Sequence, residues 1–196
     1  MRTATRAREH PIDLSTDEVQ AILEGRKTQL CRPARLNAFG RIQHRGRQWH
    51  PDHVDAVMGC PYGQPGDRLW ARERWTAWPV VGAGDLWEFR YAADGTTRII
   101  RVPDKWEPPL SVRREQDAPA RHLPRWASRI TLEIVDRRLE ALMDLTTEDA
   151  LAEGFLSTWA FWFVWDEVYG KRGLGLQNDP LVWVIKFKRV GCQPPF

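Results

Sequence analysis

Gly25-Arg26-Lys27-Thr28-Gln29-Leu30-Cys31-Arg32-Pro33 is the stretch around which the rest of the chain is organised. It follows residues 15–24, whose apolar positions recur at helical spacing, and Gly25 is the residue type that commonly ends such a helix. Residues 27–32 then predict a strand. The cations of this stretch are open to two interpretations. Either they stabilise the negative end of the helix dipole and belong to a solvated edge strand, or they line a cleft and bind an anionic or polar ligand.

The segment before this stretch carries a helix start signal. Ser15 and Glu18 have the spacing of a capping box, in which each side chain satisfies a backbone N–H of the first helical turn. Residues 12–14 alternate between apolar and acidic side chains and predict a short strand ahead of the helix. Residues 1–9 are polar, and we expect them to be frayed.

Downstream, strand signals alternate with loops. Residues 86–93 and 97–102 flank Asp94-Gly95, a strong signal for a β-hairpin. The remaining expectations are strands over 68–75, 130–135 and 181–187, helices over 146–154 and 157–169, and loop insertions over 34–58 and 103–123. This order predicts a single α+β domain over 1–196, built as a small, mostly antiparallel β-barrel with helices at its ends.

The net charge of the chain is too small for the protein to be a simple polycation. The formal net charge is only +3, although arginine supplies 24 of the 29 cations. Guanidinium groups suit bidentate capture of phosphate or carboxylate and stacking on bases, whereas a GC-rich genome would enrich arginine without a functional reason. Residues 1–48 are mainly basic and residues 137–170 mainly acidic. The basic part therefore either pairs with the acidic part or faces a ligand.

Cysteine usage and hydropathy indicate a soluble, intracellular protein. The chain has three cysteines, an odd and low number that argues against a disulfide framework and suits a reducing compartment. No apolar run reaches the roughly 18 residues of a membrane span, and the N-terminus lacks the apolar core of a signal peptide. We expect no membrane partner.

The sequence lacks the usual signals for metals and cofactors. His50, His53 and Cys60 are possible metal ligands, but they belong to no Cys-x-x-Cys pair and to no His-Glu-x-x-His helix. There is neither a glycine-rich phosphate loop nor a Gly-x-Ser-x-Gly elbow. We expect no metal and no cofactor.

A lysine and a glutamate are the strongest candidates for chemistry. A lysine that lies among tryptophans is desolvated, and desolvation makes its amine a better base, which is the role we consider for Lys27. Glu153 ends the helix predicted over 146–154, where a carboxylate opposes the helix dipole. A carboxylate in this unfavourable position indicates a functional site, although the alternative is a surface glutamate that interacts only with solvent.

Arginine and tryptophan recur together over 70–75 and 125–129. The arginines would hold phosphates while an aromatic ring stacks on a base, or the tryptophans fill the barrel and the arginines cover it. By contrast, Phe161, Trp165 and Val168 of the helix over 157–169 follow helical spacing, which favours core packing over binding. The candidate binding residues are Arg26, Arg32, Trp70, Arg72, Glu73, Trp75, Arg125, Trp126 and Arg129.

Five stretches match a known pattern: Gly25 to Thr28, Gly66 to Glu73, Pro124 to Ile130, Ala150 to Gly154 and Trp183 to Phe187. Together they resemble the ASCH domain family, and more narrowly the ASCH-type proteins encoded by bacteriophages and prophages. The resemblance covers most of residues 11–190 and implies a PUA-like β-barrel with a cleft suited to RNA or a nucleoside. Some small bacterial members hydrolyse the acetyl amide of N(4)-acetylcytidine with a lysine, a threonine and a glutamate. By motif, that lysine falls on Lys27 and that glutamate on Glu153.

One position departs from the family pattern. The family threonine falls on position 30, which is a leucine here, and a leucine cannot attack a carbonyl group. Thr28 or Cys31 would then substitute for it, or Lys27 would activate water directly, or the amidohydrolase chemistry is absent. Thr28 shares a strand face with Leu30, whereas Cys31 is expected on the other face.

Three functions are consistent with the sequence. The first is binding of RNA, another single-stranded nucleic acid or a free nucleoside. The second is an amidohydrolase in which Lys27 is the base, Glu153 shuttles the proton, and Arg72 or Arg129 holds the oxyanion or a phosphate. The third is a ribonuclease that uses loop histidines as acid and base. The candidate histidines are His50, His53 and His122.

Overall fold

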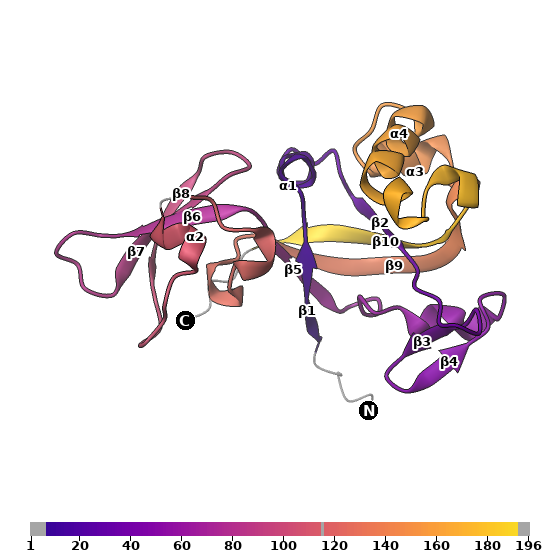
Figure 1. The fold of residues 1–196 in the computed structure, drawn as a ribbon, viewed down its shortest axis with the longest axis horizontal. Helices are drawn as coiled ribbons and strands as arrows, with labels where there is room; N and C mark the ends of the chain where they lie inside the picture. The colour runs from indigo at the N-terminus through magenta and orange to yellow at the C-terminus, as the bar shows by residue number, and fades with distance from the viewer. Residues whose placement is uncertain (1–6, 115, 192–196) are drawn as a thin grey trace.

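A five-stranded sheet lies at the centre of the molecule in the computed structural model, which describes residues 7–114 and 116–191 (Figure 1). Its strand order is β1-β5-β9-β10-β2. The strands are β1 (Glu9–Asp13), β2 (Gln29–Pro33), β5 (Arg68–Arg72), β9 (Thr131–Ala141) and β10 (Leu181–Val190). All neighbours pair antiparallel except β1 and β5, which are parallel.

Two smaller sheets accompany the large one. Strands β6 (Trp75–Pro79), β7 (Leu86–Tyr91) and β8 (Thr97–Arg101) form an antiparallel sheet that extends to one side of the molecule (Figure 1). Strands β3 (Ile42–His44) and β4 (Arg47–Trp49) form a separate hairpin. The hairpin predicted around Asp94-Gly95 is confirmed, because β7 and β8 flank this turn and pair with each other.

The helices are short, and α1 (Thr16–Leu23), α3 (Thr147–Ala152) and α4 (Thr158–Tyr169) begin at side-chain caps. The other helical elements are α2 (Leu110–Arg113) and the 3-10 turns η1 (Val54–Gly59), η2 (Ala120–His122), η3 (Arg125–Ala127), η4 (Leu142–Asp144), η5 (Gly170–Arg172) and η6 (Leu176–Asn178). Ser15 and Glu18 form the predicted capping box of α1, and Ser157 caps α4. Gly25 follows α1 with a φ of +77°, a conformation that strains other residues.

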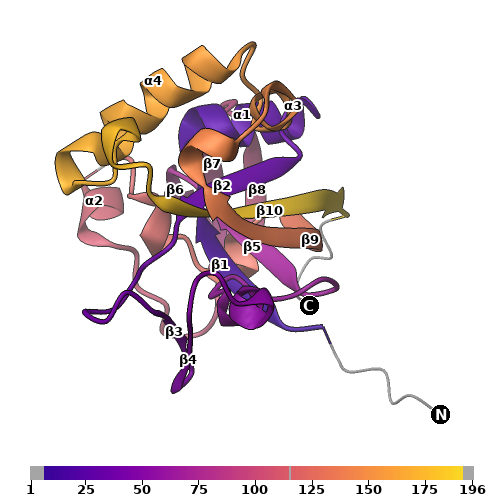
Figure 2. The same ribbon diagram turned by 90° about the vertical axis from the view of Figure 1, so that its right-hand side faces the viewer.

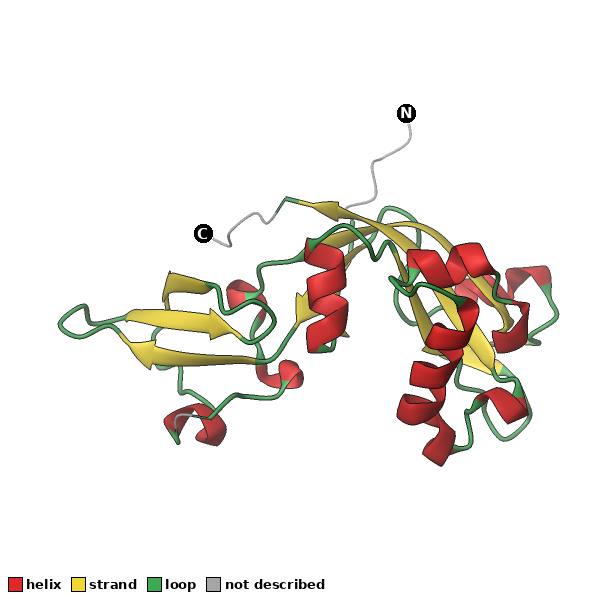
Figure 3. Cartoon of the chain, turned by 90° about the horizontal axis from the view of Figure 1, so that it is seen from above, coloured by secondary structure: helices red, strands yellow, loops and turns green. Residues whose placement is uncertain are grey.

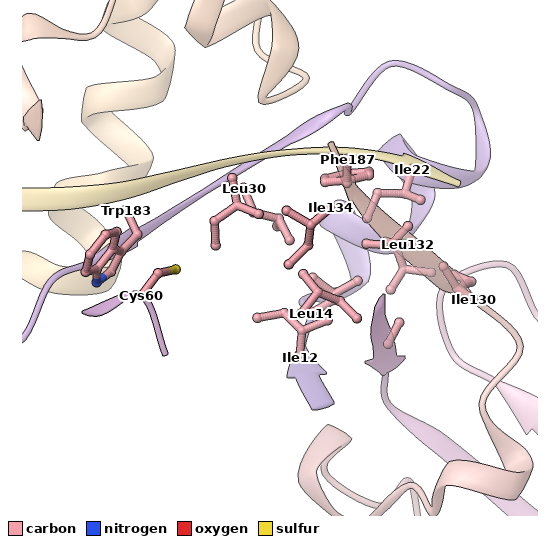
Figure 4. Packing of buried hydrophobic residues seen from close by; sticks show 14 of the residues in the cluster. Ile12, Leu14, Ile22, Leu30, Cys60, Ile130, Leu132, Ile134, Trp183 and Phe187 are labelled. Atoms are coloured by element: carbon pink, nitrogen blue, oxygen red, sulfur yellow. The ribbon is translucent and has the colours of Figure 1, made fainter. Parts of the chain in front are cut away.

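Strand alternation divides the large sheet between two cores. On β10, Trp183 and Ile185 enter the core that also holds α1, whereas Val182 and Val184 pack beneath α3 and α4. Figure 4 shows the first core, where residues of β1, β9 and β10 converge. Both Figure 1 and Figure 2 place α3 and α4 on the opposite side of the sheet from the β3–β4 hairpin.

The predicted closed barrel is not formed by the described residues. Strands β1 and β2 are the two edges of the sheet, and neither pairs with a further strand within 7–114 and 116–191. Helix α1 connects these edges and inserts Val19 and Ile22 into the core, so a helix fills the space that a closing strand pair would occupy. The α+β class and the mostly antiparallel pairing are confirmed.

The strand predicted over 68–75 is broken in two. Strand β5 ends at Arg72, and Trp75 begins β6 in the small sheet. Leu69 and Ala71 are buried on one face of β5, whereas Glu73 lies beyond the end of this strand, in the connection to β6. Trp75 instead joins a separate aromatic core of the small sheet, where its ring stacks on Phe89 at 5.1 Å.

The two insertions contain regular structure that the sequence pattern did not indicate. The first contains the β3–β4 hairpin and most of η1, and the second contains α2 and η2. The predicted frayed segment 1–9 lies mostly outside the described residues, and β1 already begins at Glu9. Seen from above, the small sheet projects away from the large sheet and its helices (Figure 3). No helix in the described ranges has the length and apolar character needed to cross a bilayer.

Candidate functional site

A pocket of about 570 Å³ lies where α1, β2, the end of α3 and α4 meet. We call it the Lys27 pocket. Its ionisable lining residues are Asp13, Asp17, Glu18, Arg26, Lys27, Cys31, Arg32, Glu153 and Tyr169. Its apolar wall consists mainly of Phe155, Phe161, Val164, Trp165 and Val168. A cavity of this volume with an apolar wall and converging polar groups is typical of small-molecule sites.

Lys27 and Glu153 form a buried ion pair in this pocket. Their side chains are 2% and 4% exposed, and Lys27 Nζ donates a hydrogen bond to Glu153 Oε2. Nζ also donates to the main-chain oxygen of Glu153 at 3.2 Å and lies 3.6 Å from Glu18 Oε1. Glu153 Oε1 is buried and receives no hydrogen bond from the described residues. The two residues selected from the sequence therefore meet in the pocket, and the second carboxylate oxygen of Glu153 is buried beside the thiol of Cys31.

Main-chain contacts bring the two partners together. The Thr28 N–H donates to the carbonyl oxygen of Ala152 at 2.8 Å, which attaches the start of β2 to the end of α3. Glu153 is the C-cap of α3, and Gly154 follows with a φ of +89°. A Cβ at Gly154 would lie 3.3 Å from the Cβ of Ala21, so glycine permits both the turn and the close approach to α1.

Glu18 and Arg32 form a second pair beside the first. Arg32 Nη1 lies 3.0 Å from Glu18 Oε1, and Arg32 Nη2 lies 3.2 Å from Oε2. Burial raises the pKa of Glu18, but the charges of Arg32 and Lys27 outweigh it and lower the pKa below its usual value. Burial lowers the pKa of Arg32, but the negative charge of Glu18 raises it by more, so the pKa lies above its usual value. The site thus presents two cations that face two carboxylates.

The structure places the three candidate attacking groups differently. Leu30 is fully buried in the core that holds α1, and its side chain lies away from the pocket. Thr28 is exposed and does not line the pocket. Cys31 does line it, but burial, followed by the nearby Glu153 carboxylate, raises the pKa of its thiol well above the usual range. Of the alternatives left by the sequence, a water molecule beside the Lys27–Glu153 pair fits this geometry best.

Helix α4 serves the core and the pocket at the same time. Phe161 and Trp165 are buried, as core packing predicts, yet both also line the pocket. Val168 also lines the pocket but is 48% exposed, so for this residue the core interpretation is wrong. Trp165 Nε1 donates to the Leu174 carbonyl oxygen at 2.8 Å, which fixes the indole ring in the wall.

Asp149 makes α3, and with it the position of Glu153, sensitive to acid. Burial raises the pKa of Asp149, but hydrogen bonds from Arg138 and from the N–H and hydroxyl of Thr146 outweigh it and lower the pKa to about 2. An unfolded aspartate titrates near pKa 3.9, so the unfolded state binds the proton first. The stabilisation from this carboxylate is present above about pH 4 and is lost as the pH falls towards 2.

We expect Asp149→Asn to destabilise the protein by about 1–2 kcal/mol at pH 7, since it weakens the helix cap and removes the charged acceptor of Arg138. Urea unfolding at pH 7 and pH 3 measures the effect. The difference in free energy of unfolding between wild type and variant should be smaller at pH 3, where Asp149 begins to bind a proton. An equal difference at both pH values would contradict the assignment.

Glu73 and Arg129 lie outside the Lys27 pocket and pair with each other. Arg129 donates from Nε and Nη2 to both oxygens of Glu73 at 2.8 Å, and from Nη1 to Asp94 Oδ2 at 2.8 Å. Its guanidinium carbon lies 4.3 Å from the ring centroid of Tyr91. These contacts occupy the guanidinium group, so it is not placed to hold an oxyanion beside Lys27.

Trp70, Arg72 and Arg125 form another separate group. Both guanidinium groups lie over the Trp70 ring, with centroid distances of 5.8 Å for Arg72 and 5.9 Å for Arg125. Arg72 pairs with Asp13, and Arg125 pairs with Glu9. Trp126 packs against the aromatic core of the small sheet, as Trp75 does. Of the candidate binding residues, the Lys27 pocket therefore collects Arg26 and Arg32 alone.

The loop histidines do not form an acid–base pair. The His53 side chain accepts a hydrogen bond from the Asp55 N–H and caps η1, and His50 lies beside Asp52. His122 is exposed in η2. Within the described residues, no group of three or more histidine, cysteine, aspartate or glutamate side chains is arranged to hold a metal ion.

Sequence reasoning missed several residues of the pocket. Glu18 was assigned only a capping role, yet it also contacts Arg32 and approaches Lys27. Gln20 and Tyr169 line the pocket without any preceding signal. For Glu18 a signal existed, because a carboxylate one helix before a basic strand is a natural ion-pair partner. Tyr169 is separated from Lys27 by most of the chain and had no such signal.

Comparisons with known proteins do not identify a family. No family model matches the chain, and no curated protein matches it. A crystal structure of the protein EF3133 from Enterococcus faecalis V583, described by the family model DUF984, is similar with a TM-score of 0.45 and 10% identity. The alignment covers 99% of this chain and 86% of that chain. A similarity this weak carries no argument about fold or function.

Proposed function

We propose that the Lys27 pocket binds a neutral heteroaromatic molecule of nucleoside size. The observation that carries this proposal is the buried Lys27–Glu153 pair in a 570 Å³ cavity whose other wall is aromatic and aliphatic. The pair offers a donor and an acceptor to the edge of a base, and the wall formed by α4 offers apolar surface to its ring. The resemblance to ASCH-type proteins of phages and prophages, with their PUA-like cleft, is independent support for a nucleoside.

The charge balance favours a free nucleoside over an RNA backbone in this pocket. Three basic side chains line it against four carboxylates, and Arg26 is further paired with Glu24. Phosphate groups would approach Asp13, Asp17 and Glu18, and like charges repel most strongly where they are partly desolvated. A ligand without charge avoids this repulsion. The proposed place of action is the cytoplasm of a bacterial host, as the sequence predicts.

Calorimetric titration with cytidine and N(4)-acetylcytidine tests the binding proposal. We expect Val168→Trp to abolish binding, because the added indole ring occupies the pocket that Val168 lines. The matched control is Leu156→Trp, since Leu156 is 93% exposed and does not line the pocket. The proposal fails if neither nucleoside binds, or if both variants bind as the wild type does.

Amide hydrolysis is a second candidate, and the buried Oε1 of Glu153 favours it. Glu153 takes a proton from a water molecule, whose oxygen attacks the carbonyl carbon of the acylated base. The Lys27 ammonium donates a hydrogen bond to the carbonyl oxygen as negative charge develops there. The C–N bond then breaks, and the departing amine takes the proton from Glu153. Water and N(4)-acetylcytidine thereby yield cytidine and acetic acid, which releases its proton to solvent and leaves as acetate.

Chromatography of N(4)-acetylcytidine incubated with the protein separates this activity from binding. Turnover should fall by a factor of about 10² or more in Glu153→Gln, which keeps the side-chain shape but cannot accept the proton. Thr28→Val is the control, because Thr28 lies outside the pocket, and it should leave turnover unchanged. Unaltered N(4)-acetylcytidine at high enzyme concentration would refute hydrolysis of this substrate and leave the binding proposal to the titration.

A further inference from the structure

A second cavity, of about 460 Å³, lies between the β3–β4 hairpin and the strands β1 and β9. We call it the basic pocket. Arg8, Arg45, Arg47 and Arg137 line it, and Asp67 is its acidic lining residue. The hairpin that forms one wall lies on the opposite side of the sheet from α3 and α4, the helices of the Lys27 pocket (Figure 2). The two cavities therefore differ in position and in charge.

Three of the four arginines that line the basic pocket are not paired with a carboxylate among the described residues. By contrast, Arg72 and Arg125 are each paired with a carboxylate. Within 7–114 and 116–191, Arg8, Arg45 and Arg47 form no ion pair. These three side chains are exposed, so water screens their mutual repulsion, but cations around one cavity still favour the entry of an anion.

The acid in this pocket is already occupied by main-chain donors. Asp67 Oδ1 accepts the Arg8 N–H at 3.0 Å, and Oδ2 accepts the Gln64 N–H at 3.0 Å. Its carboxylate therefore orders the local chain and neutralises the arginines only in part. Arg137 donates a hydrogen bond from Nη1 to the Gly63 carbonyl oxygen, which holds its guanidinium group in the lining of the cavity.

A histidine supplies a further polar atom that makes no hydrogen bond with the described residues. His10 Nε2 is buried and makes no hydrogen bond with the described residues, and it lies 4.0 Å from Asp67 Oδ2. A buried polar atom without a partner is costly, and a ligand oxygen in the cavity would satisfy it. This atom and the unpaired guanidinium groups call for the same kind of ligand, one with several acceptor oxygens.

The turn of the hairpin adds a backbone argument. Arg45 occupies the first turn position with a φ of +49°, and Gly46 follows at +77°. Asparagine or glycine adopts this conformation more readily than arginine does. A strained arginine at the tip of a hairpin that lines a basic cavity favours a role for its side chain there.

We propose that the basic pocket binds phosphate groups, carried either by a free nucleotide or by the phosphodiester backbone of a single-stranded RNA. Guanidinium groups bind phosphate oxygens through paired, charge-assisted hydrogen bonds, and the histidine adds a donor. This site is separate from the Lys27 pocket, so the phosphate proposal does not depend on the proposed nucleoside function.

Fluorescence anisotropy of a labelled 12-nucleotide oligouridine RNA tests the proposal, with uridine 5′-monophosphate and inorganic pyrophosphate as competitors. The variant is Arg45→Asn with Arg47→Gln, in which asparagine tolerates the turn conformation. It should weaken RNA binding at least about tenfold and reduce the slope of log affinity against log salt by about 0.7 for each lost contact. The control is Arg101→Gln with Arg113→Gln, which removes the same charge from exposed arginines outside the pocket.

The two arms identify the source of the phosphate. RNA binding that depends on Arg45 and Arg47 and resists competition by the mononucleotide assigns the backbone. If uridine 5′-monophosphate or pyrophosphate displaces the labelled RNA, the ligand is assigned as a free phosphate group. Absence of binding to any of these probes, or equal loss in variant and control, overturns the proposal. Urea unfolding of both variants verifies that each is folded before binding is compared.

Discussion

Lys27→Met lowers the free energy of unfolding by about 3–5 kcal/mol, the range expected when one partner of a buried ion pair is removed. The Glu153 side chain is 4% exposed, and Lys27 is the partner of its Oε2 while Oε1 has none among the described residues. The substitution therefore leaves a buried carboxylate without compensation. Urea unfolding at pH 7, followed by tryptophan fluorescence, measures the loss.

The double variant Lys27→Met with Glu153→Gln recovers most of that loss, because no unpaired charge stays in the pocket. Thr28→Met is the matched control, since it places the same side chain at the neighbouring exposed position and should change stability by less than about 1 kcal/mol. If Lys27→Met were as stable as wild type, the pair would be solvated and the pocket assignment would fail.

Arg129→Ala has an expected effect of similar size, about 3–5 kcal/mol, and for a related reason. Its side chain is 9% exposed and that of Glu73 is 2% exposed. Burial raises the pKa of Glu73, while the Arg129 hydrogen bonds lower it, and burial prevails. Removal of the guanidinium group leaves this acid buried alone and also releases Asp94 at the β7–β8 turn. Equilibrium unfolding in urea gives the loss directly.

Two further variants define the cause. Arg129→Lys keeps a charge but cannot make the paired contact with Glu73, so it should lose an intermediate amount of stability. Arg125→Ala breaks the more exposed pair with Glu9 and should cost about 1 kcal/mol or less. A stable Arg129→Ala protein that instead loses ligand binding would reverse our assignment and restore the binding role predicted from the sequence.

The elements that the sequence predicted well are those with local signals. Alternation, capping residues and the Asp94-Gly95 turn act over a few residues, so the β7–β8 hairpin and helices α1, α3 and α4 lie close to where they were expected. The β3–β4 hairpin was missed because its strands are three residues each and mostly polar. The barrel was expected from the order of strands and helices and from the resemblance to ASCH domains, and the order of the elements does not specify whether the two edges of the sheet meet.

For the site, local pattern and tertiary structure contributed different parts. The sequence by itself determined which residue types are unusual in their setting: a lysine in a strand-like stretch after a helix, and a glutamate at the end of another helix. Only the tertiary structure decided that Lys27 and Glu153 meet, while Arg72 and Arg129 take other partners. The reason is that the fold brings together segments 126 residues apart, whereas periodicity and capping report interactions within one helix or strand.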